Sequence, residues 1–136
     1  MVERGQIRNK ELASRNNRDY SKLRFQNITP TDIDCFVELW NRGYWIMELK
    51  SEGANLRGGQ RLAIERLTDT LTDAGKIAVA VVAIAPKGIE NDILAHDCPV
   101  GEYRYLKAWE PGKDGLIVID MWNWWIAKIQ ESLQAG

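Results

Sequence analysis

Three of the four acidic side chains in residues 31–50, together with the one lysine, lie at spacings that suit metal-dependent chemistry. Asp32 and Asp34 are two residues apart, and so are Glu48 and Lys50. In an extended strand, residues i and i+2 share one face of the sheet, so each pair points one way. Neighbouring carboxylates repel each other and favour a bound cation, and a site built only from oxygen ligands suits Mg²⁺ or Mn²⁺. The pattern therefore predicts a divalent metal site.

A β-hairpin is the element that must bring these residues together. Residues 33–40 and 44–50 each alternate between an apolar set and a set that contains the charged side chains. The run Asn41-Arg42-Gly43 separates them, and a short loop that contains glycine is typical of a hairpin turn. We therefore expect two antiparallel strands joined at residues 41–43.

The register of this hairpin decides which charged groups meet. If Trp40 pairs near Tyr44, Asp34 lies opposite or diagonal to Glu48 and Lys50, within reach of both side chains. Burying such a cluster costs free energy unless its charges are paired or bind a metal. The alternative interpretation is a surface ion-pair ladder, in which Lys50 bridges Asp34 and Glu48 on an exposed face.

The next predicted element is a helix over residues 59–73. Its apolar stripe comprises Ile64, Leu67 and Leu71, and Gln60 falls on the same stripe one turn earlier. Because that stripe packs on the sheet, Gln60 is expected to face the strand that carries Glu48. Two roles for Gln60 remain open: it satisfies backbone groups of the first helical turn, or it orients a water or a phosphate in an active site.

The remaining pattern predicts further strands and a tryptophan-rich last helix. Residues 76–84 form a continuous apolar run typical of a strand buried on both faces, parallel to a hairpin strand. Residues 100–109 predict another strand, and Asp120 is the expected N-cap of a helix that ends near Gln134. The apolar stripe of this helix contains Trp122, Trp125, Ile126, Ile129 and Leu133. These side chains belong to the core, or they stack on bases or on another subunit, with Trp124 beside the stripe.

Length and charge indicate a basic arm and one folded domain. Of the 136 residues, we assign 1–20 to an N-terminal arm or helix and 21–136 to the domain, with residues 22–28 as a short strand. Residues 1–24 have a net charge of +4, although the whole chain is at −1. Such a segment can bind phosphates, and it is equally typical of a solvated terminus.

Cysteine, histidine and hydropathy exclude several classes of protein. Two cysteines and one histidine provide neither a disulfide framework nor the ligand spacing of a zinc site. No apolar run reaches the ~20 residues that a membrane-spanning helix needs. We expect a cytoplasmic protein, in a bacterium or a phage-infected host cell, with no membrane partner.

The hairpin motif resembles that of a nuclease superfamily. Asp34, then thirteen residues, then Glu48-Leu49-Lys50 is similar to the PD-(D/E)XK signature, and Pro30-Thr31-Asp32 resembles its PD portion. Within this superfamily, residues 22–65 look like small phage-type and resolvase-like endonucleases. In those enzymes the helix after the E-x-K strand often opens with Gly-Gln, as Gly59-Gln60 does here.

The resemblance implies a fold and a site. The implied fold is α/β with a restriction-endonuclease-like core, a mixed β-sheet flanked by helices in the order αβββαβ. The implied metal ligands are carboxylates and one backbone carbonyl: Asp34, Glu48, the carbonyl of Leu49 and, as a further candidate, Asp32. The implied catalytic residues are Asp34, Glu48, Lys50 and Gln60. Related resolvases add a glutamate from the first helix, and Glu11 is the candidate for it here.

The resemblance also implies a function. We expect an endonuclease that uses Mg²⁺ or Mn²⁺ to hydrolyse DNA and acts as a homodimer. Branched DNA or phage DNA is the expected substrate. Expected DNA contacts are the basic side chains of Lys22, Arg24 and Arg57. Two alternatives stay open: an inactive relative that binds DNA or a protein partner, and a structural module that assembles through its tryptophan-rich helix.

Overall fold

The computed structural model describes residues 19–88 and 92–135. The chain separates into two compact units, Met1–Pro30 and Thr31–Gly136, and each is described by itself. In the first unit, Phe25 and Ile28 exchange two backbone hydrogen bonds of 2.9 Å, and this isolated bridge replaces the strand predicted at residues 22–28. The arm or helix expected at residues 1–20 lies almost entirely outside the described residues.

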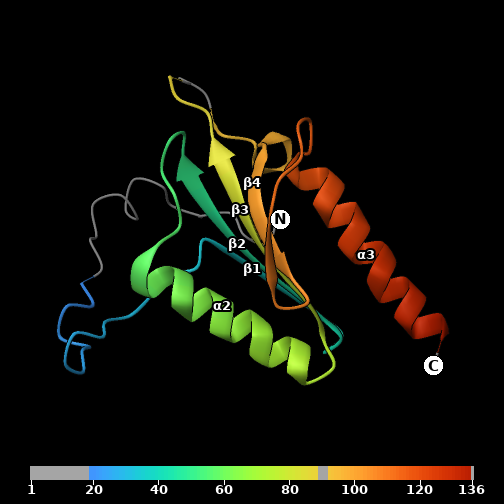
Figure 1. The fold of residues 1–136 in the computed structure, drawn as a ribbon, viewed down its shortest axis with the longest axis horizontal. Helices are drawn as coiled ribbons and strands as arrows, with labels where there is room; N and C mark the ends of the chain where they lie inside the picture. The colour runs from blue at the N-terminus through green and yellow to red at the C-terminus, as the bar shows by residue number, and fades with distance from the viewer. Residues whose placement is uncertain (1–18, 89–91, 136) are drawn as a thin grey trace, which may run out of the picture. The chain divides into compact units, whose positions relative to one another are not determined.

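In its described part, the unit of residues 31–136 is an α/β fold with a five-stranded mixed sheet (Figure 1). The strands lie across the sheet in chain order: β1 (Cys35–Leu39), β2 (Gly43–Ser51), β3 (Ile77–Ala85), β4 (Val100–Tyr105) and β5 (Ala108–Pro111). Strands β2 and β3 run parallel, and the other neighbouring pairs run antiparallel. Two helices described in this unit flank the sheet, α2 (Gly58–Asp73) and α3 (Val118–Gln134), and the 3₁₀ helix η1 (Ala95–Asp97) precedes β4.

The order of elements corrects the sequence prediction. The described residues follow ββαβββα instead of αβββαβ. The last four elements of the expected order, ββαβ, are present, but its first strand is replaced by the bridge of residues 25 and 28, and its first helix lies outside the described residues. In addition, residues 100–109, which we expected to form a single strand, form a hairpin. Leu106 and Lys107 both have positive φ, as a two-residue turn of this kind requires. Glycine or asparagine usually marks such a turn, so leucine and lysine gave no local signal of it.

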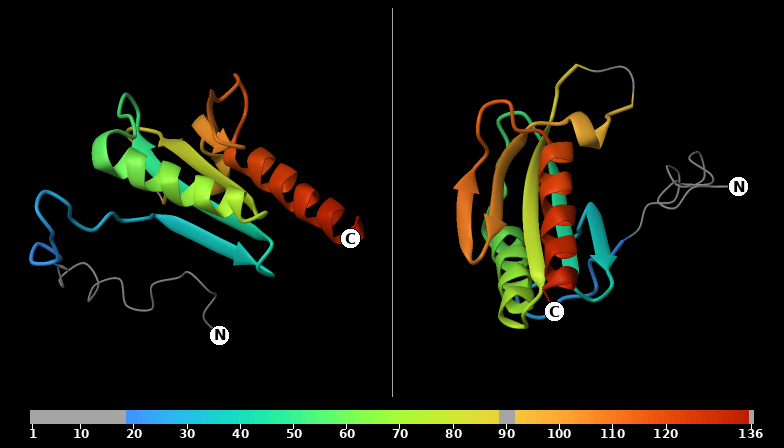
Figure 2. Two further views of the ribbon diagram at one scale, coloured as in Figure 1. Left: turned by 60° about the horizontal axis from the view of Figure 1, so that its bottom comes forward. Right: turned by 90° about the vertical axis from the view of Figure 1, so that its right-hand side faces the viewer.

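The two faces of the sheet carry separate cores, because alternate residues of β2 and β3 point to opposite sides. Trp45 and Met47 pack with α3, whereas Ile46 packs with Leu56 and with Ile64 of α2. Figure 2, right, shows α3 in front of the strands and α2 behind them. Residues 78–83 of β3 are all buried, as the prediction of a central strand requires. Alternate residues along a strand therefore face α2 or α3, and the position of a site residue in its strand decides which helix it faces.

Tryptophans dominate the α3 side. Trp45, Trp122 and Trp125 form a triangle with ring centroids 5.1–5.7 Å apart, so the interpretation of the stripe as core is confirmed there. Trp124 is half-buried against Tyr105. The predicted stripe is wrong at two positions. It omitted Met121, which is buried, and it included Leu133, which lies in the last turn and is 47% exposed.

The start of α3 also differs from the prediction. Ile117, not Asp120, is the N-cap residue, and Asp120 lies three positions into the helix. From there its carboxylate accepts a hydrogen bond of 3.1 Å from the Ile117 N–H. A carboxylate stabilises a helix both at the N-cap and in the first turn. Asp120 therefore correctly indicated a helix start, but the predicted start was wrong by three residues.

Helix α2 begins one residue before the predicted start and ends where it was expected. Gly75, at φ +83°, terminates it, and the Gly75 and Lys76 N–H groups donate to carbonyls of the last turn. The buried face follows Ile64 and Thr68, whereas the predicted Leu67 is 38% exposed. Thr68 tolerates burial because its hydroxyl donates to the Ile64 carbonyl at 2.7 Å.

The β1–β2 turn is shifted by one residue from the expected loop. Leu39 pairs with Gly43, so Trp40, Asn41 and Arg42 form the turn. Trp40 and Asn41 both have φ of +53°, which takes Trp40 out of the strand that was predicted to contain it. Tyr44 consequently pairs with Glu38 instead of Trp40, which shifts the register by two residues.

The close approach of Gly43 to α3 generates a stability prediction. A Cβ atom at position 43 meets Ile129 Cγ1 at 2.8 Å and the Trp125 ring at 2.9 Å. We expect Gly43→Ala to lower the free energy of unfolding by about 1–3 kcal/mol, measured by urea denaturation, because the core is already filled.

Two further variants test this cause. Adding Ile129→Val to Gly43→Ala removes the methyl group nearest the new atom, so part of the loss should be recovered relative to the sum of the single changes. Gly59→Ala, at an open helical position, should leave stability unchanged or slightly higher. Equal losses at positions 43 and 59 would contradict the packing explanation.

Candidate functional site

The hairpin places Asp34 beside Glu48. Cys35 and Met47 form the last residue pair of the β1–β2 ladder, so the residue before Cys35 lies across from the residue after Met47. This is one of the two arrangements expected from the sequence, and it puts Asp34 opposite Glu48 instead of Lys50. Both side chains lie on the face that α2 covers.

Just before β1 begins, the Asp34 side chain replaces a backbone group as the hydrogen-bond partner of β2. Its Oδ2 accepts a hydrogen bond of 2.8 Å from the Leu49 backbone N–H. Within a strand, the N–H and C=O groups of one residue point to the same side. The Leu49 carbonyl therefore also points toward this edge, past the last paired residue of β1. A carboxylate and a backbone carbonyl are thus both expected at the open end of the ladder.

Glu48 is a buried carboxyl group that directly follows three buried apolar residues of β2, residues 45–47. It is 3% exposed, and its Oε1 accepts a hydrogen bond of 3.1 Å from Gln60 Nε2. Burial, together with a hydrogen bond and charge repulsion from Asp34, raises the pKa of Glu48 from 4.5 to about 7. The Lys50 charge acts in the opposite direction and only partly compensates. The site therefore disfavours a second negative charge.

Gln60 connects the two functional side chains of β2. Its Nε2 donates to Glu48, while its Oε1 accepts a hydrogen bond of 2.8 Å from Lys50 Nζ. The prediction that Gln60 faces this strand is confirmed, and its amide binds side chains instead of backbone groups. The ion-pair ladder does not form, because no pair of atoms within 4.0 Å joins Lys50 to Asp34 or Glu48 in the described chain.

The other predicted site residues are exposed or lie outside the described residues. Asp32 is exposed and contributes no hydrogen bond to it among the described residues. Arg57, the N-cap residue of α2, is exposed at the end of the helix that carries Gln60. Lys22 and Arg24 are exposed in the unit of residues 1–30. Glu11 lies outside the described residues.

The donor set for a metal is small. No group of three or more His, Cys, Asp or Glu side chains gathers as a metal site within residues 19–88 and 92–135. Asp34, Glu48 and the Leu49 carbonyl supply two carboxylates and one neutral oxygen. Mg²⁺ commonly takes only one or two protein carboxylates and keeps several waters, so this set suits such an ion.

Sequence reasoning missed an ion pair next to Gln60. Arg61 binds Glu102 of β4 through two hydrogen bonds of 3.0 and 2.8 Å. Glu102 pairs with Val82, which in turn pairs with Glu48, so both carboxylates lie in one row across the sheet. No local motif signals such a pair, because its members are 41 residues apart.

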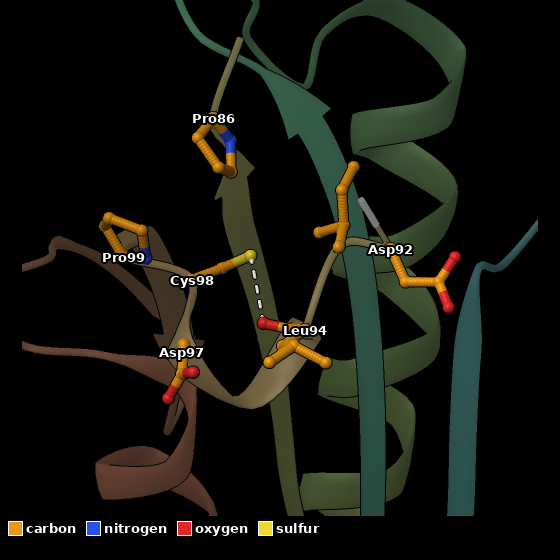
Figure 3. A pocket seen from close by; sticks show the side chains of 7 residues that line it. Pro86, Asp92, Leu94, Asp97, Cys98 and Pro99 are labelled. Carbon is orange, nitrogen blue, oxygen red and sulfur yellow. Dashed lines mark hydrogen bonds between the residues drawn. The ribbon is translucent and has the colours of Figure 1, made fainter. Parts of the chain in front are cut away.

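A separate pocket of about 320 Å³ lies between the end of β3 and the start of β4. Figure 3 shows the carboxylates of Asp92 and Asp97 at opposite ends of it, with Cys98 Sγ 3.6 Å from the Leu94 carbonyl. None of the hairpin residues lines this pocket. Within the described residues these two acids belong to no group of three or more potential metal ligands, so the pocket adds nothing to the donors of the hairpin.

Protein-family models, curated proteins and solved structures were each compared with the chain, and none of the three comparisons gave a match. No helix within residues 19–88 or 92–135 is both long enough and apolar enough to cross a membrane.

The raised pKa of Glu48 predicts how stability depends on pH in metal-free protein. Because the folded-state pKa of about 7 exceeds the ordinary 4.5, the folded state holds the extra proton between these values. The free energy of unfolding should therefore fall as pH rises through this window. The Glu48 contribution to this fall is on the order of 3 kcal/mol.

The variant Glu48→Gln isolates this contribution, since glutamine keeps the hydrogen-bonding shape without titrating. In urea denaturation with EDTA, wild type and variant should be about equally stable near pH ~4, and the variant more stable near pH ~8. A difference that does not change with pH would show that the Glu48 carboxyl titrates normally.

Proposed function

We propose that this chain is a metal-dependent endonuclease of the PD-(D/E)XK type, with a restriction-endonuclease-like α/β core. The observation that carries the proposal is the buried Glu48 carboxyl, held beside Asp34 and linked through Gln60 to Lys50. A fold gains no stability from two adjacent carboxylates in this position. A cation between them removes the repulsion, which gives the arrangement a function.

The residues present fit Mg²⁺ or Mn²⁺. Asp34, Glu48 and the Leu49 carbonyl are the oxygen donors that would hold the ion, and hard divalent cations prefer such donors. A bound ion of this kind supplies a Lewis acid for the phosphate and lowers the pKa of a coordinated water.

The other side chains position the reacting groups. The Leu49 N–H fixes the Asp34 carboxylate, and Gln60 holds Glu48 with one end of its amide and Lys50 with the other. Lys50 thereby presents its ammonium group beside the carboxylates, where it stabilises negative charge that develops on a scissile phosphate. This complete set favours an active enzyme over the inactive relative that binds DNA or a protein.

DNA is the proposed substrate and partner. Arg57 is exposed at the N-terminus of α2, and a helix N-terminus with an arginine suits a phosphate group. Lys22 and Arg24 are proposed as further phosphate contacts from the other unit. Preference for branched or phage DNA, and a homodimer, remain predictions from the resemblance.

A nicking assay tests the proposal. Supercoiled plasmid, linear duplex and a four-way junction are incubated with wild type in Mg²⁺, in Mn²⁺ and in EDTA. We expect metal-dependent cleavage of at least one substrate. Asp34→Asn, Glu48→Gln and Lys50→Met should each lower the rate at least ~100-fold, because each removes a group that acts on the reacting phosphate or its ion.

Glu38→Gln is the matched control. Glu38 lies on β1 four residues from Asp34, about 13 Å along the strand, and its carboxylate binds the Asn41 N–H of the turn. The cleavage rate of Glu38→Gln should equal that of wild type. Cleavage that survives Glu48→Gln and Lys50→Met together would remove the assignment, and binding of DNA without cleavage by wild type would favour the inactive relative.

A further inference from the structure

Two arginine–carboxylate pairs attach α2 to β4, and they run in opposite directions. Arg61 of the helix donates to Glu102 of the strand at 3.0 and 2.8 Å. Arg104 of the strand donates to Asp69 of the helix at 2.8 and 2.7 Å. Each pair is bidentate, which fixes direction as well as distance. One pair therefore holds the beginning of α2 and the other holds its second half.

Trp109 of β5 joins the two pairs into one network. The Arg61 guanidinium lies 4.2 Å from the centroid of its ring, and that of Arg104 lies 5.7 Å away. Its indole N–H donates to Glu65 of α2 at 2.8 Å. The flat ring thus limits how the arginines can rotate, so the height of the helix above the sheet is set by polar contacts as well as by the apolar core.

Only the first pair adjoins the candidate site. Arg61 directly follows Gln60, and its guanidinium also donates to the Leu56 carbonyl at 3.2 Å, in the loop that leads into the helix. The first turn of α2 has no side-chain N-cap and no acidic residue to stabilise it. Besides the hydrogen bonds of Gln60 itself, the Arg61–Glu102 pair is consequently the polar contact described that ties this turn to the sheet.

We propose that the Arg61–Glu102 pair is the positioning element of the candidate metal site. It holds Gln60 at the height at which its amide reaches both Glu48 and Lys50, and it acts on the metal only through that amide. The Arg104–Asp69 pair anchors the same helix but does not share this role. The inference rests on the proposed function for its metal, but its effect on Gln60 is independent of any metal.

The two anchors provide a matched comparison. Glu102→Gln and Asp69→Asn each neutralise one carboxylate of a bidentate pair, and the exposed fractions of those side chains are similar, at 22% and 25%. Two properties are measured on the full chain: the affinity for Mn²⁺ by calorimetry, and the NMR signals of the Gln60 side-chain amide in metal-free protein. Urea denaturation confirms that both variants fold.

We expect Glu102→Gln to weaken Mn²⁺ binding about 10-fold, which is typical for loss of a group that orients a metal ligand, and to shift the Gln60 amide signals. Asp69→Asn should leave both properties close to wild type, although it lowers stability. Arg61→Lys, which keeps the charge but loses the fork, should reproduce the shift and serves as the second variant if Glu102→Gln does not fold.

The outcomes separate this inference from the proposed function. Equal effects of Glu102→Gln and Asp69→Asn on the Gln60 amide, or no effect of either, would overturn the positioning role even if Mn²⁺ binds. Absence of Mn²⁺ binding by wild type, with Gln60 signals that move only in Glu102→Gln and Arg61→Lys, would remove the metal site and support the positioning of Gln60.

Discussion

Burial of the Glu48 carboxyl is the constraint to which the surrounding structure responds. Glu48 lies on the inner strand β2 and is almost without solvent, with Val82 of β3 on one side and the like charge of Asp34 on the other. Such a group persists only where polar partners or a cation compensate it. Gln60 supplies one compensating hydrogen bond, so helix α2 must begin where its first turn overlies Glu48. This contact acts together with the apolar cluster around Ile64 and the two arginine–carboxylate pairs to place the helix.

The two faces of the sheet are stabilised by different kinds of contact. The α3 side is an apolar core in which tryptophan rings fill the volume, and this burial provides most of the driving force for folding. The α2 side has a small apolar cluster and a network of ion pairs that involve Arg61 and Arg104. Such pairs contribute little net stability but demand a defined geometry. The face that carries the candidate site is therefore the one whose geometry is fixed by direction-dependent contacts.

This division accounts for the position of the candidate site. Asp34 and the Leu49 carbonyl lie where β1 has just begun and no longer covers β2, so the sheet itself opens an edge to solvent. Glu48 and Lys50 project from the same strand toward α2, and Gln60 joins them. Acidic side chains, a lysine and an accessible edge thus meet at one point, which is the combination on which the proposed phosphodiester hydrolysis depends.

The sequence by itself determined the local elements: the hairpin, the α2 helix with Gln60 on its inner side, and the buried strand β3. Each is encoded by periodicity and by nearby glycines, which act over a few residues. Only the tertiary structure decided that Asp34 faces Glu48, that residues 100–109 turn back on themselves, and that Thr68 replaces Leu67 on the buried side. It also decided the pairing of Arg61 with Glu102. These features depend on contacts between residues distant in the chain, and local pattern contains no information about which distant partner will be met.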